Sequence, residues 1–339
     1  MTGSRKRVAL AVAFVVLLAA LYGAQAALTA LQEAGPSGAP PLPTMESAAQ
    51  LMLVGFRAMV VDVFWMQASN LQEKGRLDEA VAKYGQITRL QPDLADVWHY
   101  LIWNIMYNLP YEVEAVEDKW NLIKLGVEYT EVAAKRVPDN GYFDKDIGFM
   151  LWHRFDDRTF GEAEYLRRKF LETKGRTNFD AAIEWLEKAV VSKEFEELGE
   201  GAKDIWRRQI THTLDRWTTQ AFVDGDLPTA RSVAGRAIEK WQWAAQFNPS
   251  HDPKLDINLD RMKEARKRLQ AVERFIESKE ASDAGRVDDA IRQAEESVDA
   301  WQWLVDAWPS GPDLPGLQKA AAWLERLRVD KKAKDEKKP

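Results

Sequence analysis

Few side chains in this sequence stand at spacings that would form a catalytic or metal site. Cysteine is absent, which removes thiolate ligands, cysteine nucleophiles and disulfides together. Phosphate-binding glycine loops, Gly-x-Ser-x-Gly turns and His-Glu-x-x-His helices are absent as well. No two of the four histidines have a metal-ligand spacing; they are His99, His153, His212 and His251. We therefore expect no metal, no cofactor and no enzymatic activity.

Adjacent acidic residues are numerous, and they predict solvated helix surface. Pairs such as Glu112 with Glu114, or Asp156 with Asp157, would act as acid and base only if burial separated their pKa values. Neighbouring residues of a helix point to different faces, about 100° apart. The pairs are therefore expected to face water.

Arg57 and Asp62 stand out because they interrupt an apolar helical pattern. Five residues apart on a helix, they diverge by about 140° and cannot pair as neighbours four apart can. Two interpretations remain open. Each residue meets a partner on another helix, in a buried ion pair that fixes how the first helix docks, or Arg57 holds an anionic group of a ligand.

Two asparagines, Asn104 and Asn108, lie one helical turn apart among aromatic residues. Trp98, Trp103 and Tyr107 flank them. Side-chain amides in such a setting either hydrogen-bond the backbone of a partner or tie down the insertion that we expect over residues 107–118. Both interpretations stay open, and we count Trp98, Trp103, Asn104 and Asn108 as candidate partner-binding residues.

The elements that must position these residues repeat with a period of sixty. Self-similarity at a fixed period indicates units that bury their apolar faces by stacking on neighbours. The C-terminal half should thus contain helices over 204–223 and 255–284, each followed by a lengthened partner helix. Gly225, Ala230, Trp241, Gln242, Trp243, Pro249 and Ser250 reappear as Gly285, Ala290, Trp301, Gln302, Trp303, Pro309 and Ser310.

Each repeat contains a Trp-Gln-Trp motif whose two rings cannot both face the core. Adjacent helical residues diverge by about 100°, so Trp243 and Trp303 leave the side on which the first ring is buried. Each second ring either contacts the next helical unit or reaches a surface, where it would offer a stacking face to a ligand. Both are therefore candidate binding residues.

Between residues 46 and 155 the chain resembles a tetratricopeptide repeat protein. That family pairs two helices through small and aromatic residues and ends the second helix with proline. Phe64, Ala68, Ala80, Tyr84 and Pro92 fit this pattern, whereas Gln67, Leu71 and Ile87 depart from it. The resemblance implies an all-α solenoid of helical hairpins, a fold that commonly binds protein or peptide partners.

The same region also looks like uncharacterised bacterial membrane-anchored proteins with tetratricopeptide-like repeats. Gly55-Phe56-Arg57, with the aromatic and asparagine residues of 98–108, carries this likeness. It implies the same architecture and an anchor, and no particular activity.

The N-terminus predicts export. Arg5, Lys6 and Arg7 precede an uncharged apolar segment at 8–22, and the next basic residue is Arg57. The positive-inside rule then keeps the N-terminus in the cytoplasm and exports the rest. The segment through residue 31 would span a bilayer as an anchor, whereas cleavage after Ala26 would make it a signal peptide.

We therefore predict a single-pass protein of the cytoplasmic membrane whose bulk lies on the periplasmic side and binds a protein or peptide partner. A net charge of −6 disfavours nucleic acid. The 14 tryptophans leave a cell-envelope glycan as the alternative ligand. No particular oligomeric state is predicted. The expected parts are a membrane segment (1–32), a Pro/Gly-rich linker (33–44), tetratricopeptide-like repeats (45–175), longer hairpins (176–329) and a disordered lysine-rich tail (330–339).

Overall fold

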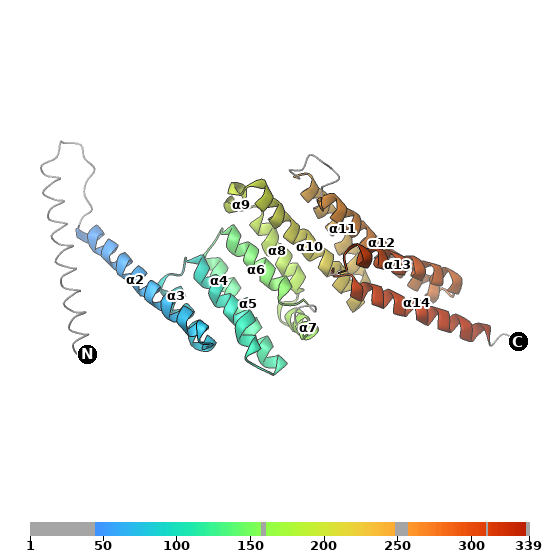
Figure 1. Ribbon diagram of the computed structural model, residues 1–339, viewed down its shortest axis with the longest axis horizontal. Helices are drawn as coiled ribbons and strands as arrows, with labels where there is room; N and C mark the ends of the chain where they lie inside the picture. Colours follow the sequence, from blue (N-terminus) through green and yellow to red (C-terminus); the bar gives the residue numbers. More distant parts are fainter. Residues whose placement is uncertain (1–44, 157–160, 248–256, 310, 337–339) are drawn as a thin grey trace. The chain divides into compact units, whose positions relative to one another are not determined.

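The computed structural model describes residues 45–156, 161–247, 257–309 and 311–336, with side chains described from residue 57 onward. Within these ranges every element is a helix (Figure 1), which confirms the all-α prediction for this part of the chain. The predicted membrane segment and the linker lie outside the described residues. Among the helices that are described, none is long and apolar enough to cross a bilayer.

The chain divides into two compact units, Met1–Phe64 and Trp65–Pro339. Helix α2, Met45–Glu73, runs through this division. The other described helices belong to the second unit: α3 (Leu77–Leu90), α4 (Ala95–Trp103), the π-helix η1 (Asn104–Asn108), the 3-10 helix η2 (Leu109–Tyr111), α5 (Val116–Arg136), α6 (Gly141–His153), α7 (Ala163–Lys174), α8 (Asn178–Ala189), α9 (Lys193–Glu197), α10 (Glu200–Asp224), α11 (Leu227–Ala245), α12 (Ile257–Asp283), α13 (Val287–Ala307) and α14 (Leu314–Asp335).

The sixty-residue repeat forms two hairpins of similar form. Helix α10 packs on α11, and α12 packs on α13. Gly225 and Gly285 follow the first helix of each hairpin with φ of 89° and 74°. Glycine adopts this left-handed conformation without strain and so ends the helix in a tight turn. The helices expected over 204–223 and 255–284 are thus confirmed as α10 and α12, apart from residues 255–256, which are not described.

Equivalent residues of the two hairpins form the core. Ala230 and Ala290 have no exposed surface, which allows the paired helices to approach closely. Trp241 and Trp301 are also completely buried. Helix α14 closes over the second ring, because a Cβ atom added to Gly316 would lie 2.9 Å from the Trp301 ring. Helix α14 therefore covers the second hairpin.

The first helices of the second unit pack through the residues that carry the tetratricopeptide resemblance. Ala80 and Tyr84 of α3 are buried, and the Trp65 ring meets Tyr84 edge to face at 5.8 Å. The indole nitrogen of Trp98 donates to the carbonyl of Pro92 at 2.8 Å. This bond ties the start of α4 to the turn that follows α3.

Two predicted boundaries can be compared with the described helices. Across the boundary predicted near residue 175, α6 and α8 pack on each other, and the two compact units are divided between Phe64 and Trp65. The tail predicted to be disordered from residue 330 is helical as far as Asp335. Lys331 forms an ion pair with Asp288 of α13 at 2.6 Å. Because Asp288 lies 43 residues away, the local sequence around Lys331 could not predict this contact.

Candidate functional site

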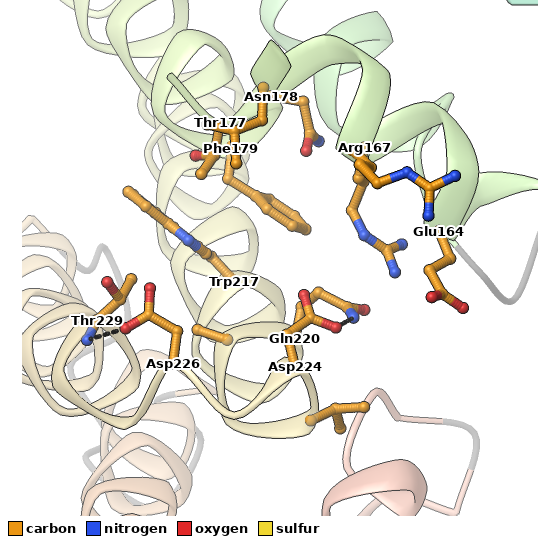
Figure 2. Close-up of a pocket in the computed structure, with 14 residues that line it drawn as sticks. Glu164, Arg167, Thr177, Asn178, Phe179, Trp217, Gln220, Asp224, Asp226 and Thr229 are labelled. Carbon is orange, nitrogen blue, oxygen red and sulfur yellow. Dashed lines mark hydrogen bonds between the residues drawn. The ribbon is translucent and has the colours of Figure 1, made fainter. Parts of the chain in front are cut away.

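An open groove of about 650 Å³ lies between α7 on one side and α10 with the start of α11 on the other (Figure 2). Its floor consists of Phe179 and Trp217, whose rings stack with centroids 6.2 Å apart. Leu171 lines the groove from α7 and is 48 % exposed. Phe179 and Trp217 are only 5 % and 8 % exposed, so Leu171 supplies the solvent-exposed apolar surface of the groove.

Two helix junctions position the walls of the groove. Gly175 ends α7 in the left-handed conformation, and the Thr177 hydroxyl caps α8 by accepting from the Asp180 amide at 3.0 Å. At the other junction Gly225 ends α10, and Asp226 caps α11 by accepting from the Thr229 amide at 3.2 Å. Both caps satisfy amides that a helix start leaves without a partner.

The walls carry charges of opposite sign. Arg167 and Arg168 line the groove from α7, together with Glu164, whereas Asp224 and Asp226 line it at the α10–α11 junction. Figure 2 shows Phe179 and Trp217 between Arg167 and Asp226.

Hydrogen bonds orient one charged group on each wall. An Arg167 Nη1 donates to the Phe155 carbonyl at 2.9 Å. Gln220 Nε2 donates to Asp224 Oδ1 at 2.8 Å. The lining can thus supply apolar and ionic contacts to a ligand.

Three of the predicted binding residues are used inside the fold. Trp98 is 5 % exposed and bonded to Pro92. Asn104 is fully buried and donates from Nδ2 to the Tyr100 carbonyl at 2.8 Å. Asn108 donates to Asn104 Oδ1 at 2.8 Å. Of the two open interpretations, this geometry supports the one in which the asparagines tie down the insertion.

The insertion expected over residues 107–118 begins as the π-helix η1. A single widened turn of this kind is often found at functional segments. Here it places Trp103 in a stack, with the Tyr107 ring 4.2 Å and the His99 ring 6.0 Å from the Trp103 ring. Trp103 is half-buried and keeps part of its ring at the surface.

The second tryptophan of each Trp-Gln-Trp motif contacts the first helix of its own hairpin. The guanidinium carbon of Arg207 lies 5.8 Å from the Trp243 ring centroid, and Lys267 Nζ lies 5.9 Å from that of Trp303. Arg207 and Lys267 are themselves sixty residues apart, so the repeat retains a cation over this ring. Trp243 is half-buried, whereas Trp303 is 41 % exposed.

Arg57 lies in the first compact unit and is exposed, as is Asp62. Neither is therefore the buried charge that one interpretation expected. The six other candidate residues lie in the second unit, and none of the seven lines the groove of Figure 2.

A buried ionic cluster, which the sequence analysis missed, lies at the centre of the C-terminal hairpins. Arg268 of α12 is 1 % exposed and holds Asp313 through Nε and Nη2, at 2.7 Å and 2.8 Å. Its Nη1 lies 2.9 Å from Asp215 of α10. Asp215 also accepts from the Trp241 indole nitrogen at 3.0 Å, and Asp313 accepts from Thr219 at 3.1 Å.

This environment shifts the ionisation of its members. Burial raises the pKa of Asp215 to about 6, against the opposing effect of Arg268. Burial lowers the pKa of His212 to about 4, and the nearby cations Arg261, Arg268 and Arg208 add to that effect. A carboxylate with a shifted pKa often marks an active site, but Asp215 is only 2 % exposed. The cluster is therefore a structural tie between helices.

The sequence contains a signal for helix α7, which lines the groove, and another for the buried ionic cluster. The segment 156–178 is highly charged, yet Ala163, Leu166 and Phe170 recur at helical spacing and are buried in α7. Arg268 is the repeat equivalent of Arg208, which pairs with Asp204 at 2.8 Å. A charge kept at a core-facing position of both repeats indicates an internal ion pair.

No protein-family model matches the chain, and a comparison with curated proteins finds no match. Within the described residues there is also no group of three or more His, Asp or Glu side chains that could hold a metal ion.

Proposed function

We propose that this chain is a tetratricopeptide-like solenoid that acts as a scaffold and binds a segment of another protein in the groove between α7 and α10. The groove is the observation that carries the proposal. Leu171, which is 48 % exposed, offers an apolar contact beside the largely buried, stacked rings of Phe179 and Trp217. The volume of the groove, about 650 Å³, lies within the range of about 300–1,000 Å³ typical of ligand sites.

The proposal includes a location on the outer face of a cytoplasmic membrane. Arg5, Lys6 and Arg7 followed by the apolar segment at 8–22 support it through the positive-inside rule. A phosphatase reporter fused after residue 339 should be active only if that end is exported. The intact mass of the purified protein distinguishes an anchor from a signal peptide that is cleaved after Ala26.

Photo-crosslinking tests the groove directly. A photoreactive phenylalanine analogue in place of Leu171 should give a discrete crosslinked product in intact cells, whose partner mass spectrometry identifies. The matched control replaces Leu125 of α5, a leucine of similar exposure (41 %) that does not line the groove. The control should give no such product.

Equal products from positions 171 and 125, or none from position 171 in cells grown under several conditions, would contradict the proposed groove. Because the analogue replaces an exposed leucine, the fold should survive, and circular dichroism of the purified variants checks this.

A second candidate function, binding of a cell-envelope glycan, has one specific observation in its favour. Trp303 is 41 % exposed and lies outside the groove, where its ring could stack on a sugar. Retention on isolated cell wall that is lost in Trp303→Ala, and kept in Trp243→Ala, would favour this alternative.

A further inference from the structure

A second pocket, of about 340 Å³, is basic: every charged residue in its lining is a cation. It lies between the α10–α11 junction, α12 and α14, and its lining consists of Gly225, Leu227, Phe275, Lys279, Lys319, Ala322, Trp323 and Arg326. Within the part of the chain that the structure describes, none of its three cations forms an ion pair with a carboxylate. The groove beside α7 differs, because its lining contains charges of both signs.

The Trp323 ring positions two of the cations of this basic pocket. Lys279 Nζ lies 5.8 Å from the ring centroid, and the guanidinium carbon of Arg326 lies 6.0 Å from it. The ring is itself held in place, because its indole nitrogen donates to Ser278 Oγ at 2.9 Å. Lys279 and Arg326 are both exposed. A cation–π contact does not use their N–H donors, which therefore remain available to a ligand.

Lys319 is the half-buried cation of the basic pocket. Its ammonium donates to the Val223 carbonyl at 2.8 Å and lies 5.6 Å from the Phe222 ring centroid. An ammonium has three donors, so two of them remain after the bond to Val223. A Cβ atom added to Gly225 would lie 3.6 Å from Lys319 Nζ, which places the ammonium at the pocket wall.

The acidic residues of the α10–α11 junction line the other groove. Asp224 and Asp226 each accept a hydrogen bond from a neighbour in the chain, and neither lines the basic pocket. Burial, followed by the repulsion of Lys279, lowers the pKa of the Lys319 ammonium, although Asp224 acts in the opposite direction. An anion bound between the two lysines would relieve this repulsion.

We propose that the basic pocket binds the phosphate group of a soluble phosphomonoester. Such a group carries about −1.5 to −2 charges at pH 7 and has three strong acceptor oxygens, so it can accept from Lys279, Lys319 and Arg326 together. A carboxylate has a single charge and fewer acceptors. The pocket volume of about 340 Å³ is at the lower end of the range of small-molecule sites. This site goes beyond the proposed function and does not depend on it.

Isothermal titration calorimetry of the full chain with glycerol 3-phosphate tests the proposal. Succinate, a dicarboxylate of similar size and charge, is the comparison ligand. Glycerol 3-phosphate should occupy one site per chain and bind roughly fivefold more tightly than succinate, since one additional, partly exposed ion pair contributes about that factor. Added salt should weaken the binding of both compounds.

Removal of the exposed cations gives the sharper test. Lys279→Ala and Arg326→Ala should each weaken the binding of glycerol 3-phosphate roughly fivefold, and the double variant K279A/R326A should weaken it roughly 25-fold. Lys279→Arg keeps the charge and should keep the affinity. Lys267→Ala on the same helix is the matched control: its ammonium lies 5.9 Å from the Trp303 ring centroid but outside the pocket, so the affinity should not change.

The variants are expected to fold because Lys279 and Arg326 are exposed, and urea unfolding verifies this. No binding of glycerol 3-phosphate, equally tight binding of succinate, or an unchanged affinity in K279A/R326A would each overturn the proposal. Binding only to phosphatidylcholine vesicles that contain phosphatidic acid would overturn it as well, since the cations would then serve a membrane surface. The crosslink from position 171 tests the other groove, so either proposal can fail without the other.

Discussion

At the scale of single residues, the two hairpins differ at one informative position. Trp241 donates its indole hydrogen to Asp215, whereas the equivalent Trp301 has a buried indole nitrogen without a hydrogen-bond partner among the described residues. The reason is that Phe275 stands sixty residues after Asp215. The repeat therefore supplies an internal control for the buried ionic cluster.

Replacing Trp241 by Phe should destabilise the protein more than replacing Trp301 by Phe. Both changes remove similar ring volume, but only the first removes a hydrogen bond to a buried carboxylate, which contributes about 1.5–3 kcal/mol. The free energy of unfolding from urea titration at pH 7 measures the difference. Equal losses of unfolding free energy in the two variants would show that the hydrogen bond from Trp241 to Asp215 does not stabilise the protein.

The pH dependence of the free energy of unfolding should reveal the lowered pKa of His212. Its pKa of about 4 in the folded protein is below the ordinary value of 6.5. Between these two values the unfolded chain binds the proton and the folded protein does not, so this group lowers stability as the pH falls from 6.5 to 4. Asp215 acts in the opposite direction, because its raised pKa lets the folded protein bind a proton near pH 6.

His212→Val isolates the histidine contribution, and valine is what the repeat places at the equivalent residue, Val272. Relative to the wild type, the variant should gain up to about 2 kcal/mol between pH 7 and pH 5. The effect of Asp215 is common to both proteins and cancels. Urea unfolding at the two pH values measures the change. If the unfolding free energies of the variant and the wild type differ by the same amount at pH 7 and pH 5, the lowered pKa assigned to His212 is contradicted.

At the scale of elements, the glycines that end helices should be sensitive and those inside helices tolerant. Gly285 has φ of 74°, while Gly235 lies inside α11, and a Cβ atom at either position would meet nothing within 4 Å. Gly285→Ala should therefore cost about 1 kcal/mol through backbone strain alone. Gly235→Ala should instead stabilise by about 0.5–1 kcal/mol. Thermal unfolding measures both, and destabilisation by the two changes alike would contradict this assignment of roles.

Helix ends and core registers could be predicted from the sequence because their signals are local. Gly225 and Gly285 predict the turns that end helices, and Trp241 and Trp301 predict which face of their helices is buried. Arg268 could not be matched to its partners, because Asp215 and Asp313 lie 53 and 45 residues away and only folding brings them together. Asn104 differs, because its partner Tyr100 lies only four residues away and the spacing alone does not decide between a bond to its own helix and one to a partner.

At the scale of the second compact unit, the groove is the feature that no single segment of the sequence predicts. Its walls come from α7, from the start of α8 and from the α10–α11 junction, so it spans the division that we expected near residue 175. The predicted binding residues were chosen as unusual side chains on single helices. A groove between helices depends instead on how separate helices pack, which no single helix of the sequence specifies.

Hydrogen–deuterium exchange of the full chain, with and without the partner captured from position 171, tests the central claim most directly. Amide exchange should slow in residues 164–178 and 217–229, which border the groove, and stay unchanged in α13, which does not line it. Slowing that is confined to α13 around Trp303, or to the neighbourhood of Trp103, would place the partner elsewhere and contradict the account.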